Sequence, residues 1–133
     1  MNEIWKDIYG YDGVYQISNL GNIKSLDHLV IQSNGMKRIQ RGRILSKSKS
    51  IKGYLRVSLS KLKKNKHFFI HRLVMITFKN ISDSNNKQVN HINGIKDDNR
   101  VENLEWCTNR ENIIHAYKNN LIKSNKGEKH HNI

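Results

Sequence analysis

The chain has 133 residues, with 24 Lys plus Arg against 11 Asp plus Glu, and its formal net charge is +13. This length supports one small domain with an appended module, each with a modest core. The single cysteine, Cys107, excludes a disulfide framework and a zinc ribbon made from paired cysteines. No apolar run approaches the ~20 residues needed to cross a bilayer, and the start has no signal-peptide pattern. We therefore expect an intracellular protein without a membrane partner.

Residues 1–45 are predicted to form a small antiparallel β module. Residues 14–17 suit a short strand, residues 19–22 supply a glycine-containing turn, and residues 23–26 suit the returning strand. The aromatic side chains of this module include Trp5 and Tyr15, which we expect in its core. Stacking on DNA bases is the alternative for both.

The middle of the chain is strongly basic. Residues 28–82 contain no acidic residue and fourteen basic ones, whereas the remainder carries ten basic and eleven acidic residues. A lysine-rich composition alone would still scatter Asp and Glu through this segment, so the pattern favours a nucleic-acid partner. Double-stranded DNA is the expected partner, and RNA, supported only by charge, is an alternative. The predicted DNA contacts are Lys37, Arg38, Arg41, Arg43, Lys47, Lys49, Lys52, Arg56 and Arg72.

Local patterns divide this basic middle into a linker, a hairpin and a helix. Residues 46–53, rich in serine, lysine and glycine, are predicted to form a basic flexible or extended linker. Residues 54–60 alternate apolar and polar side chains as a strand does, residues 61–66 close a hairpin, and residues 67–70 return. The pattern of residues 71–78 then changes to that of a short helix.

The segment from Val89 to Tyr117 combines one strand-borne histidine with several asparagines. Apolar positions around His91 and around Leu104 suit two short strands, with turn-forming residues between them. Thr108 followed by Glu111 is a capping-box signature and predicts a helix after the second strand. We therefore expect a strand, loop, strand and helix in about thirty residues.

These residues fit the needs of phosphodiester hydrolysis. The reaction requires a base that deprotonates water, a divalent cation that stabilises charge on the phosphate, and a group that holds the base in one tautomer. His91 can be the base, and oxygen donors from Asn90 and Asn112 can hold a hard cation such as Mg²⁺. The side-chain oxygen of Asn103 can accept a hydrogen bond from the other ring nitrogen of His91.

The segment resembles the HNH nuclease motif in its asparagine-rich version, found in phage and intron-encoded homing endonucleases. The resemblance implies that His91 is the general base, that Asn103 orients it and that Asn112 is a metal ligand on the helix. Relatives often carry aspartate where this chain has Asn90, a neutral donor that holds a cation less tightly. His115 is a candidate auxiliary ligand or phosphate contact, with a surface role as the alternative.

Two further segments resemble parts of these nucleases. Residues 3–26 resemble the fourth type of nuclease-associated modular DNA-binding motif (NUMOD), which commonly precedes such HNH domains. His71 lies in an HRLV segment that usually precedes the motif, and it is an auxiliary site candidate with a core role as the alternative. Relatives often continue from a segment like that near residue 128 into a helix-turn-helix, so we expect a shorter DNA footprint here.

The expected fold class is α+β, with a small N-terminal antiparallel β module followed by an HNH ββα-metal nuclease domain. The expected domains are the NUMOD-like module at residues 1–45, the linker at 46–53, the nuclease domain at 54–120 and a flexible tail at 121–133. The ββα-metal motif is expected at about residues 88–119.

The resemblance implies a homing-endonuclease-like enzyme that hydrolyses or nicks duplex DNA. It would use one divalent metal ion, Mg²⁺ with Mn²⁺ as the alternative, and no small-molecule cofactor. We expect a monomer, with a dimer as the alternative, in the cytoplasm of a bacterium or a phage-infected host cell. The alternative function is a catalytically inactive DNA-binding protein, such as a repressor or a mobile-element remnant.

Overall fold

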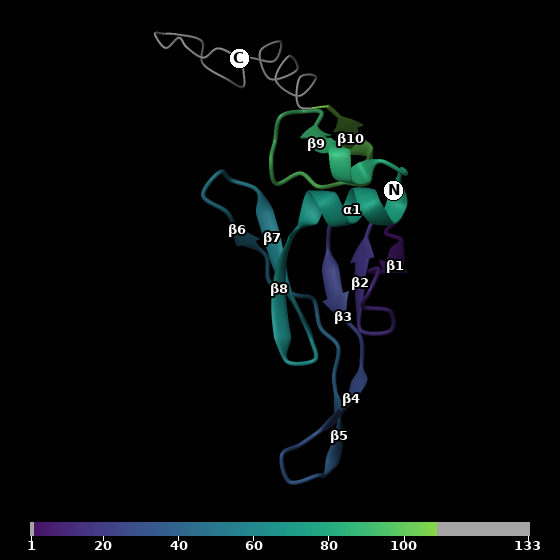
Figure 1. The fold of residues 1–133 in the computed structure, drawn as a ribbon, viewed down its shortest axis with the longest axis vertical. Coiled ribbons are helices and arrows are strands. Elements are labelled where there is room, and N and C mark those ends of the chain that lie inside the picture. Colours follow the sequence, from purple (N-terminus) through teal and green to yellow (C-terminus); the bar gives the residue numbers. More distant parts are fainter. Residues whose placement is uncertain (1, 109–133) are drawn as a thin grey trace.

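The computed structural model describes residues 2–108 and has an α+β fold, in which short antiparallel sheets surround one α-helix (Figure 1). The expected fold class is confirmed. In chain order the elements are β1 (Trp5–Asp7), β2 (Tyr15–Ser18), β3 (Ile23–Ser25), β4 (His28–Ile31), β5 (Lys37–Gln40), β6 (Ser48–Lys49), β7 (Leu55–Lys61), β8 (Lys64–Phe69), α1 (Ile70–Phe78), a 3-10 turn (Ser84–Asn86), β9 (Gln88–His91), a second 3-10 turn (Val101–Asn103) and β10 (Leu104–Cys107).

The N-terminal sheet has the order β1-β2-β3, with antiparallel pairing throughout. Ile17 of β2 pairs with Ile23 of β3, and both side chains are fully buried. Burial of one such side chain contributes about 1.5–3 kcal/mol, which explains why this short sheet has a fixed register. The predicted hairpin is confirmed, and its turn contains Gly21 at φ +86°.

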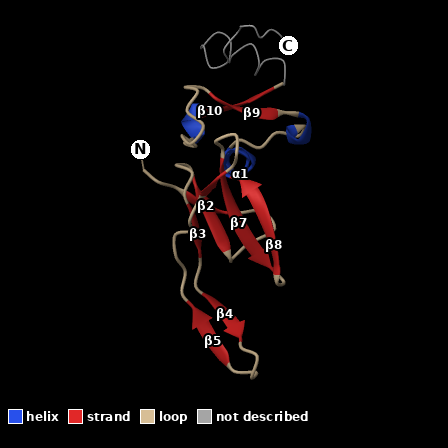
Figure 2. Ribbon diagram, turned by 90° about the vertical axis from the view of Figure 1, so that its left-hand side faces the viewer, coloured by secondary structure: helices blue, strands red, loops and turns tan. Residues whose placement is uncertain are grey.

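The β4–β5 hairpin extends away from the rest of the molecule (Figures 1 and 2). Its apolar side chains are exposed, among them Leu29, Ile31 and Ile39. These two strands were not predicted from the sequence. The reason is physical, because neither face of the hairpin is buried against a core and its side chains therefore lack a clear apolar alternation.

The third sheet has the order β6-β7-β8. β6 lies inside the segment that the sequence predicted to be a linker, because backbone pairing with β7 needs no apolar pattern. The predicted alternation along β7 is confirmed by the burial of Val57 and Leu59. The turn that follows is tighter than predicted. Leu62 and Lys63 form it with φ values of 52° and 64°, so β8 already begins at Lys64.

Helix α1 confirms the predicted helix and joins the sheets into one core. It contacts β2, β7 and β8, and also β9 and β10 (Figure 2). The N-terminal sheet also bonds directly to β7, because the Tyr15 hydroxyl accepts a hydrogen bond from the Ser60 amide at 3.1 Å. Buried apolar side chains from both halves of the chain form a single cluster: Ile8, Tyr11, Ile17, Ile23, Val57, Leu59, Ile70, Leu73, Val74, Met75, Val89 and Leu104.

Strands β9 and β10 confirm the two predicted strands on either side of the asparagine-rich loop. His91 pairs with Leu104, and Cys107 is buried as expected. The predicted capped helix, with Asn112 and His115, and the predicted tail lie outside the described residues. Within residues 2–108, no helix is long and apolar enough to cross a membrane.

Candidate active site

His91 lies at the end of β9, where the strand enters the asparagine-rich loop. Its side chain is 5% exposed, and its Nε2 atom lies 2.8 Å from the Oδ1 atom of Asn99. An amide oxygen can only accept a hydrogen bond, so the neutral ring carries its proton on Nε2 and leaves the lone pair on Nδ1. The loop therefore selects the tautomer in which Nδ1 can act as a base.

Asn103 has a different position from the one that the sequence predicted. Its amide nitrogen donates to Asn93 Oδ1 at 3.0 Å and to the Asp98 carbonyl at 2.9 Å, and its oxygen accepts from the Asn93 amide at 3.1 Å. Because Leu104 pairs with His91, Asn103 lies beyond the paired strands, beside the loop. The structure thus gives the His91 ring contact to Asn99, and Asn103 braces the loop that carries Asn99.

The catalytic loop, which we define as residues 92–103, also rests on the N-terminal sheet. The Val101 amide donates to the Asn19 carbonyl at 2.8 Å. A methyl group added at Gly21 would meet the Asn99 side chain at 2.9 Å, so glycine is needed for this close approach. Neither the role of Asn99 nor this support was predicted, because in the sequence Asn99 is only one more asparagine in an asparagine-rich segment.

Asn90 is buried on β9, directly across from Glu105 on β10. Its amide nitrogen donates to the Glu105 carboxylate at 2.8 Å. This bond fixes the amide orientation and leaves Asn90 Oδ1 as the atom suited to a hard cation. Within residues 2–108 there is no group of three His, Cys, Asp or Glu side chains that could hold a metal ion.

His91 is part of an aromatic cluster with His71 and Tyr54. The ring centroids of His71 and His91 lie 5.2 Å apart, and those of Tyr54 and His91 lie 5.8 Å apart. Burial lowers the pKa of His91, although the Asn99 hydrogen bond and the nearby carboxylates oppose this effect. Burial, with the charges of His91 and Arg72, lowers the pKa of His71 to about 3. Both imidazoles are therefore neutral near pH 7.

The predicted DNA contacts fall into two groups. Most are exposed, and Arg41 and Lys49 make only exposed ion pairs, with Asp27 at 3.1 Å and Asp97 at 3.7 Å. Arg72 is different. Its guanidinium donates to the carbonyl oxygens of Lys87 and Ser84 at 2.9 and 3.1 Å and lies over the Trp106 ring. These internal contacts give Arg72 a structural role, because they tie α1 to the chain that enters β9.

Two family models match the chain. Residues 3–60 match the NUMOD4 motif, and residues 68–113 match the HNH endonuclease family. The expected resemblance to HNH homing endonucleases with an N-terminal NUMOD4 motif is confirmed.

Particular relatives agree with this assignment. An uncharacterized HNH endonuclease of Acanthamoeba polyphaga mimivirus is 45% identical over 130 residues, covering 94% of this chain and 29% of the relative. The DNA endonuclease I-HmuI of Bacillus phage SP01 is 34% identical over 124 residues, covering 93% of this chain and 63% of the relative. A solved structure on DNA binding and cleavage by the HNH homing endonuclease I-HmuI matches with a TM-score of 0.72 at 33% identity, covering 91% of this chain and 62% of that one. This chain spans less than two thirds of each relative.

Proposed function

We propose that this protein is a DNA endonuclease that hydrolyses phosphodiester bonds of duplex DNA, with His91 as the general base. The observation that carries the proposal is the hydrogen bond between His91 Nε2 and Asn99 Oδ1, at 2.8 Å, on a buried ring. The match of residues 68–113 to the HNH endonuclease family and the similarity to the DNA endonuclease I-HmuI support it. Residues 1–45 would act as the DNA-binding module and residues 54–120 as the nuclease domain.

In the proposed reaction, Nδ1 of His91 takes a proton from water, and the resulting hydroxide attacks the phosphorus in line with the departing 3′ oxygen. The products are 5′-phosphate and 3′-hydroxyl ends. The lowered pKa of His91 keeps Nδ1 unprotonated near neutral pH, so the base is available. Asn99 prevents rotation of the ring by accepting the Nε2 proton in a hydrogen bond.

The side-chain oxygen atoms near His91 are suited to a hard divalent cation. Asn90 would contribute its Oδ1 atom, whose orientation is fixed by the bond from its amide nitrogen to Glu105, and the resemblance assigns a second oxygen to Asn112. A cation such as Mg²⁺ or Mn²⁺, when bound, supplies charge stabilisation for the phosphate and the leaving oxygen. The Glu105 carboxylate adds negative charge next to the neutral Asn90 ligand and thereby compensates in part for the absence of an aspartate.

The basic middle of the chain would supply DNA affinity through contacts with backbone phosphates. The exposed predicted contacts are Lys37, Arg38, Arg41, Arg43, Lys47, Lys49 and Lys52, and the half-buried Arg56 adds to them. Release of counterions from DNA would make the binding steeply salt-dependent. A monomer with one active site would nick one strand at a time.

Incubation with supercoiled plasmid tests the proposal. With Mg²⁺ or Mn²⁺ we expect open circles, and with EDTA we expect only a gel shift. The His91→Ala variant should lose nicking by a factor of about 10²–10⁴ and retain its affinity for DNA. His67→Ala, a change at an exposed histidine on β8, is the matched control and should nick normally. A wild-type protein that shifts DNA but never nicks it, with either metal, would support the DNA-binding alternative.

A further inference from the structure

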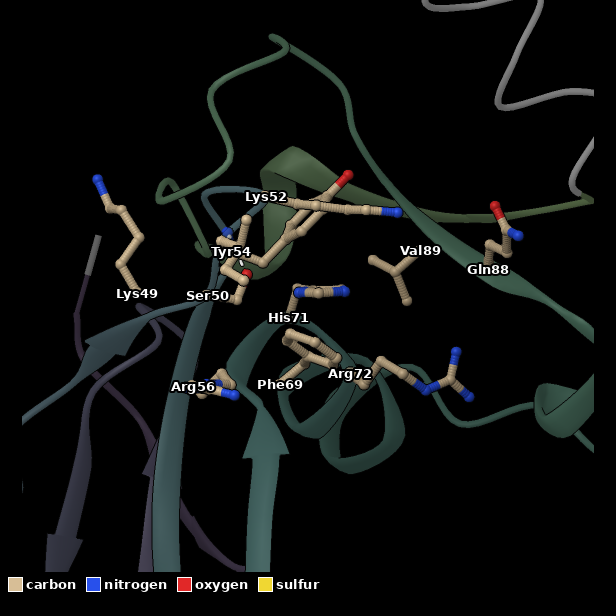
Figure 3. Close-up of a pocket in the computed structure, with 11 residues that line it drawn as sticks. Lys49, Ser50, Lys52, Tyr54, Arg56, Phe69, His71, Arg72, Gln88 and Val89 are labelled. Carbon is tan, nitrogen blue, oxygen red and sulfur yellow. Dashed lines mark hydrogen bonds between the residues drawn. The ribbon is translucent and has the colours of Figure 1, made fainter.

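A pocket of about 620 Å³ opens beside the candidate active site (Figure 3). It lies between the β6–β7 loop, the start of α1 and β9. His71 lies near the middle of this pocket in Figure 3, between Tyr54 and Phe69. His71 also contacts the ring of His91, so whatever occupies the pocket lies next to the proposed base.

The lining of this pocket is basic. Four basic side chains line it, and none of its lining residues is acidic: Lys49, Lys52, Arg56 and Arg72 contribute the charge. Because the Arg72 guanidinium is held by backbone carbonyls, the other three are the cations that can turn toward a ligand. A concave surface lined by charges of one sign concentrates ions of the opposite sign.

Two buried nitrogen atoms in this lining have no hydrogen-bond partner within the described residues. They are Nδ1 of His71 and Nε of Arg56. The His71 side chain is only 8% exposed, so its unpartnered Nδ1 atom cannot be explained by free access to water. An unpartnered buried donor costs about 1–3 kcal/mol. Both atoms have almost no accessible surface, so their side chains must turn toward the pocket to meet a ligand. A ligand with acceptor oxygens would then remove that cost.

The start of α1 provides a third feature that favours an anion. Phe69 is the N-cap residue and makes no side-chain capping bond, and the first turn carries no acidic residue. Amide groups in the first turn of a helix have no partner within the helix, and the helix dipole places partial positive charge there. Phe69, His71 and Arg72 belong to this turn and line the pocket, so the uncapped end of the helix faces it.

We propose that this pocket binds the backbone phosphate adjacent to the attacked one in the cleaved DNA strand, through His71, Arg56 and the first turn of α1. This inference rests on the proposed function for the identity of the anion as DNA. His71 is then a positioning residue that donates a hydrogen bond from its neutral ring to a phosphate oxygen. The pocket fixes the strand next to His91 and thereby sets the distance between phosphorus and the activated water.

NMR of the histidine ring nitrogens in the full chain tests this directly. The ¹⁵N-labelled protein is titrated in EDTA with a short DNA duplex, then separately with inorganic phosphate and with thymidine. We expect the duplex and phosphate to shift the His71 ring signals, and thymidine to leave them unchanged. The exposed His67 ring on β8 is the internal control. The proposed phosphate site is refuted if fluorescence anisotropy shows saturation with the duplex while the His71 signals do not shift. It is also refuted if thymidine shifts these signals and inorganic phosphate does not.

Affinity measurements on variants provide a second test. Arg56→Gln and His71→Phe, which keeps an aromatic ring, should each weaken duplex binding about tenfold, as expected for one lost hydrogen bond to a charged group. Lys66→Gln removes the same charge from the exposed part of β8 and should change binding less than Arg56→Gln. Equal losses of affinity in Arg56→Gln and Lys66→Gln would overturn the proposal that the pocket binds a phosphate. Neither test requires cleavage, so a protein that binds phosphate here but never nicks plasmid would refute the proposed function alone.

Discussion

The catalytic loop and the β4–β5 hairpin are built in opposite ways. In the loop, Asn99 and Asn103 are 3% and 6% exposed, and they are held by hydrogen bonds to the base and to the loop backbone. In the hairpin, Leu29, Ile31 and Ile39 are all more than half exposed, and the hairpin extends away from the core (Figure 1). A group that transfers protons must be fixed in position before substrate arrives, whereas a surface that binds DNA must remain accessible.

This difference predicts separable defects. Changes in the catalytic loop should alter the rate of nicking at constant affinity for DNA, because the loop positions the base. Changes in the hairpin should alter affinity and its salt dependence at a constant rate on saturating DNA, because its basic residues are proposed to contact only the DNA backbone.

Among changes in the loop and the hairpin, the largest effect should come from Asn99→Ala. Without the acceptor at 2.8 Å, the His91 ring can rotate, and a misplacement of about 1 Å can lower the rate by about 10²-fold. Single-turnover nicking and duplex affinity should be measured together, and affinity should not change.

Asn103→Ala is the matched comparison for Asn99→Ala. It removes the bonds to Asn93 and Asp98 and should lower the free energy of unfolding by about 1–3 kcal/mol. If Asn99→Ala nicks normally and Asn103→Ala alone loses activity without loss of stability, the role that the sequence assigned to Asn103 is correct.

A smaller effect, on affinity, should come from the hairpin. The triple variant Lys37→Gln, Arg38→Gln, Arg41→Gln should bind duplex DNA between about tenfold and a hundredfold more weakly near 0.1 M salt. The slope of log affinity against log salt should fall by about 2.7 if all three side chains contact phosphates. Fluorescence anisotropy at several salt concentrations measures both.

The control for this hairpin variant is Lys63→Gln, Lys64→Gln, Lys66→Gln, which removes the same charge from the β7–β8 turn. If both triple variants lose the same affinity and slope, net charge rather than the β4–β5 hairpin determines binding.

Gly21→Ala tests the support that the N-terminal sheet gives the catalytic loop. The added methyl group would meet the Asn99 side chain at 2.9 Å. Gly35→Ala is the control, because Gly35 has a similar φ of +84° but nothing within 4 Å of the added group. Both should lose about 1 kcal/mol through backbone strain, and only Gly21→Ala should also lose nicking activity. Chemical denaturation and plasmid nicking measure the two effects. Equal nicking activity in both variants would show that the N-terminal sheet does not position the catalytic loop.

Stability should depend on pH through the buried histidines. The pKa of His71 is lowered to about 3 and that of His91 is also lowered, whereas an unfolded histidine titrates near 6.5. Below pH 6.5 the unfolded chain therefore binds more protons than the folded one. The histidine contribution to stability is complete above pH 6.5 and is lost as pH falls toward about 3, by up to about 1.4 kcal/mol per pH unit for each group.

Urea denaturation between pH 7 and pH 5 measures this loss, before most carboxylates titrate. His71→Phe should flatten the dependence, because it removes the buried imidazole. If the stability of His71→Phe depended on pH as that of the wild type does, the His71 imidazole would not be buried in its neutral form.

The sequence predicted the elements whose side chains alternate between core and solvent. Val57 and Leu59 on β7, and Ile17 and Ile23 in the first hairpin, carry a clear apolar pattern, and the structure confirms their burial. The β4–β5 hairpin and β6 could not be predicted in this way, because backbone pairing alone forms them.

The site was predicted in part. The position of His91 at a strand end followed from the pattern, but its ring partner did not. Asn99 and Asn103 have the same side chain, so only the fold of the loop determines which of them contacts the His91 ring. That fold depends on the Asn103 hydrogen bonds and on the close packing of Asn99 against Gly21. The single core shared by both halves also required structure, since no sequence pattern indicated that Tyr15 would bond to β7.

In the proposed mechanism, the imidazole of His91 removes the proton from the attacking water. Single-turnover nicking of supercoiled plasmid by His91→Gly, with and without added imidazole, tests this role. We expect that His91→Gly is nearly inactive, that imidazole restores nicking in a concentration-dependent way, and that the restored rate increases with pH through the pKa of free imidazole. A His91→Gly protein that nicks at the wild-type rate without imidazole would show that His91 is not the base.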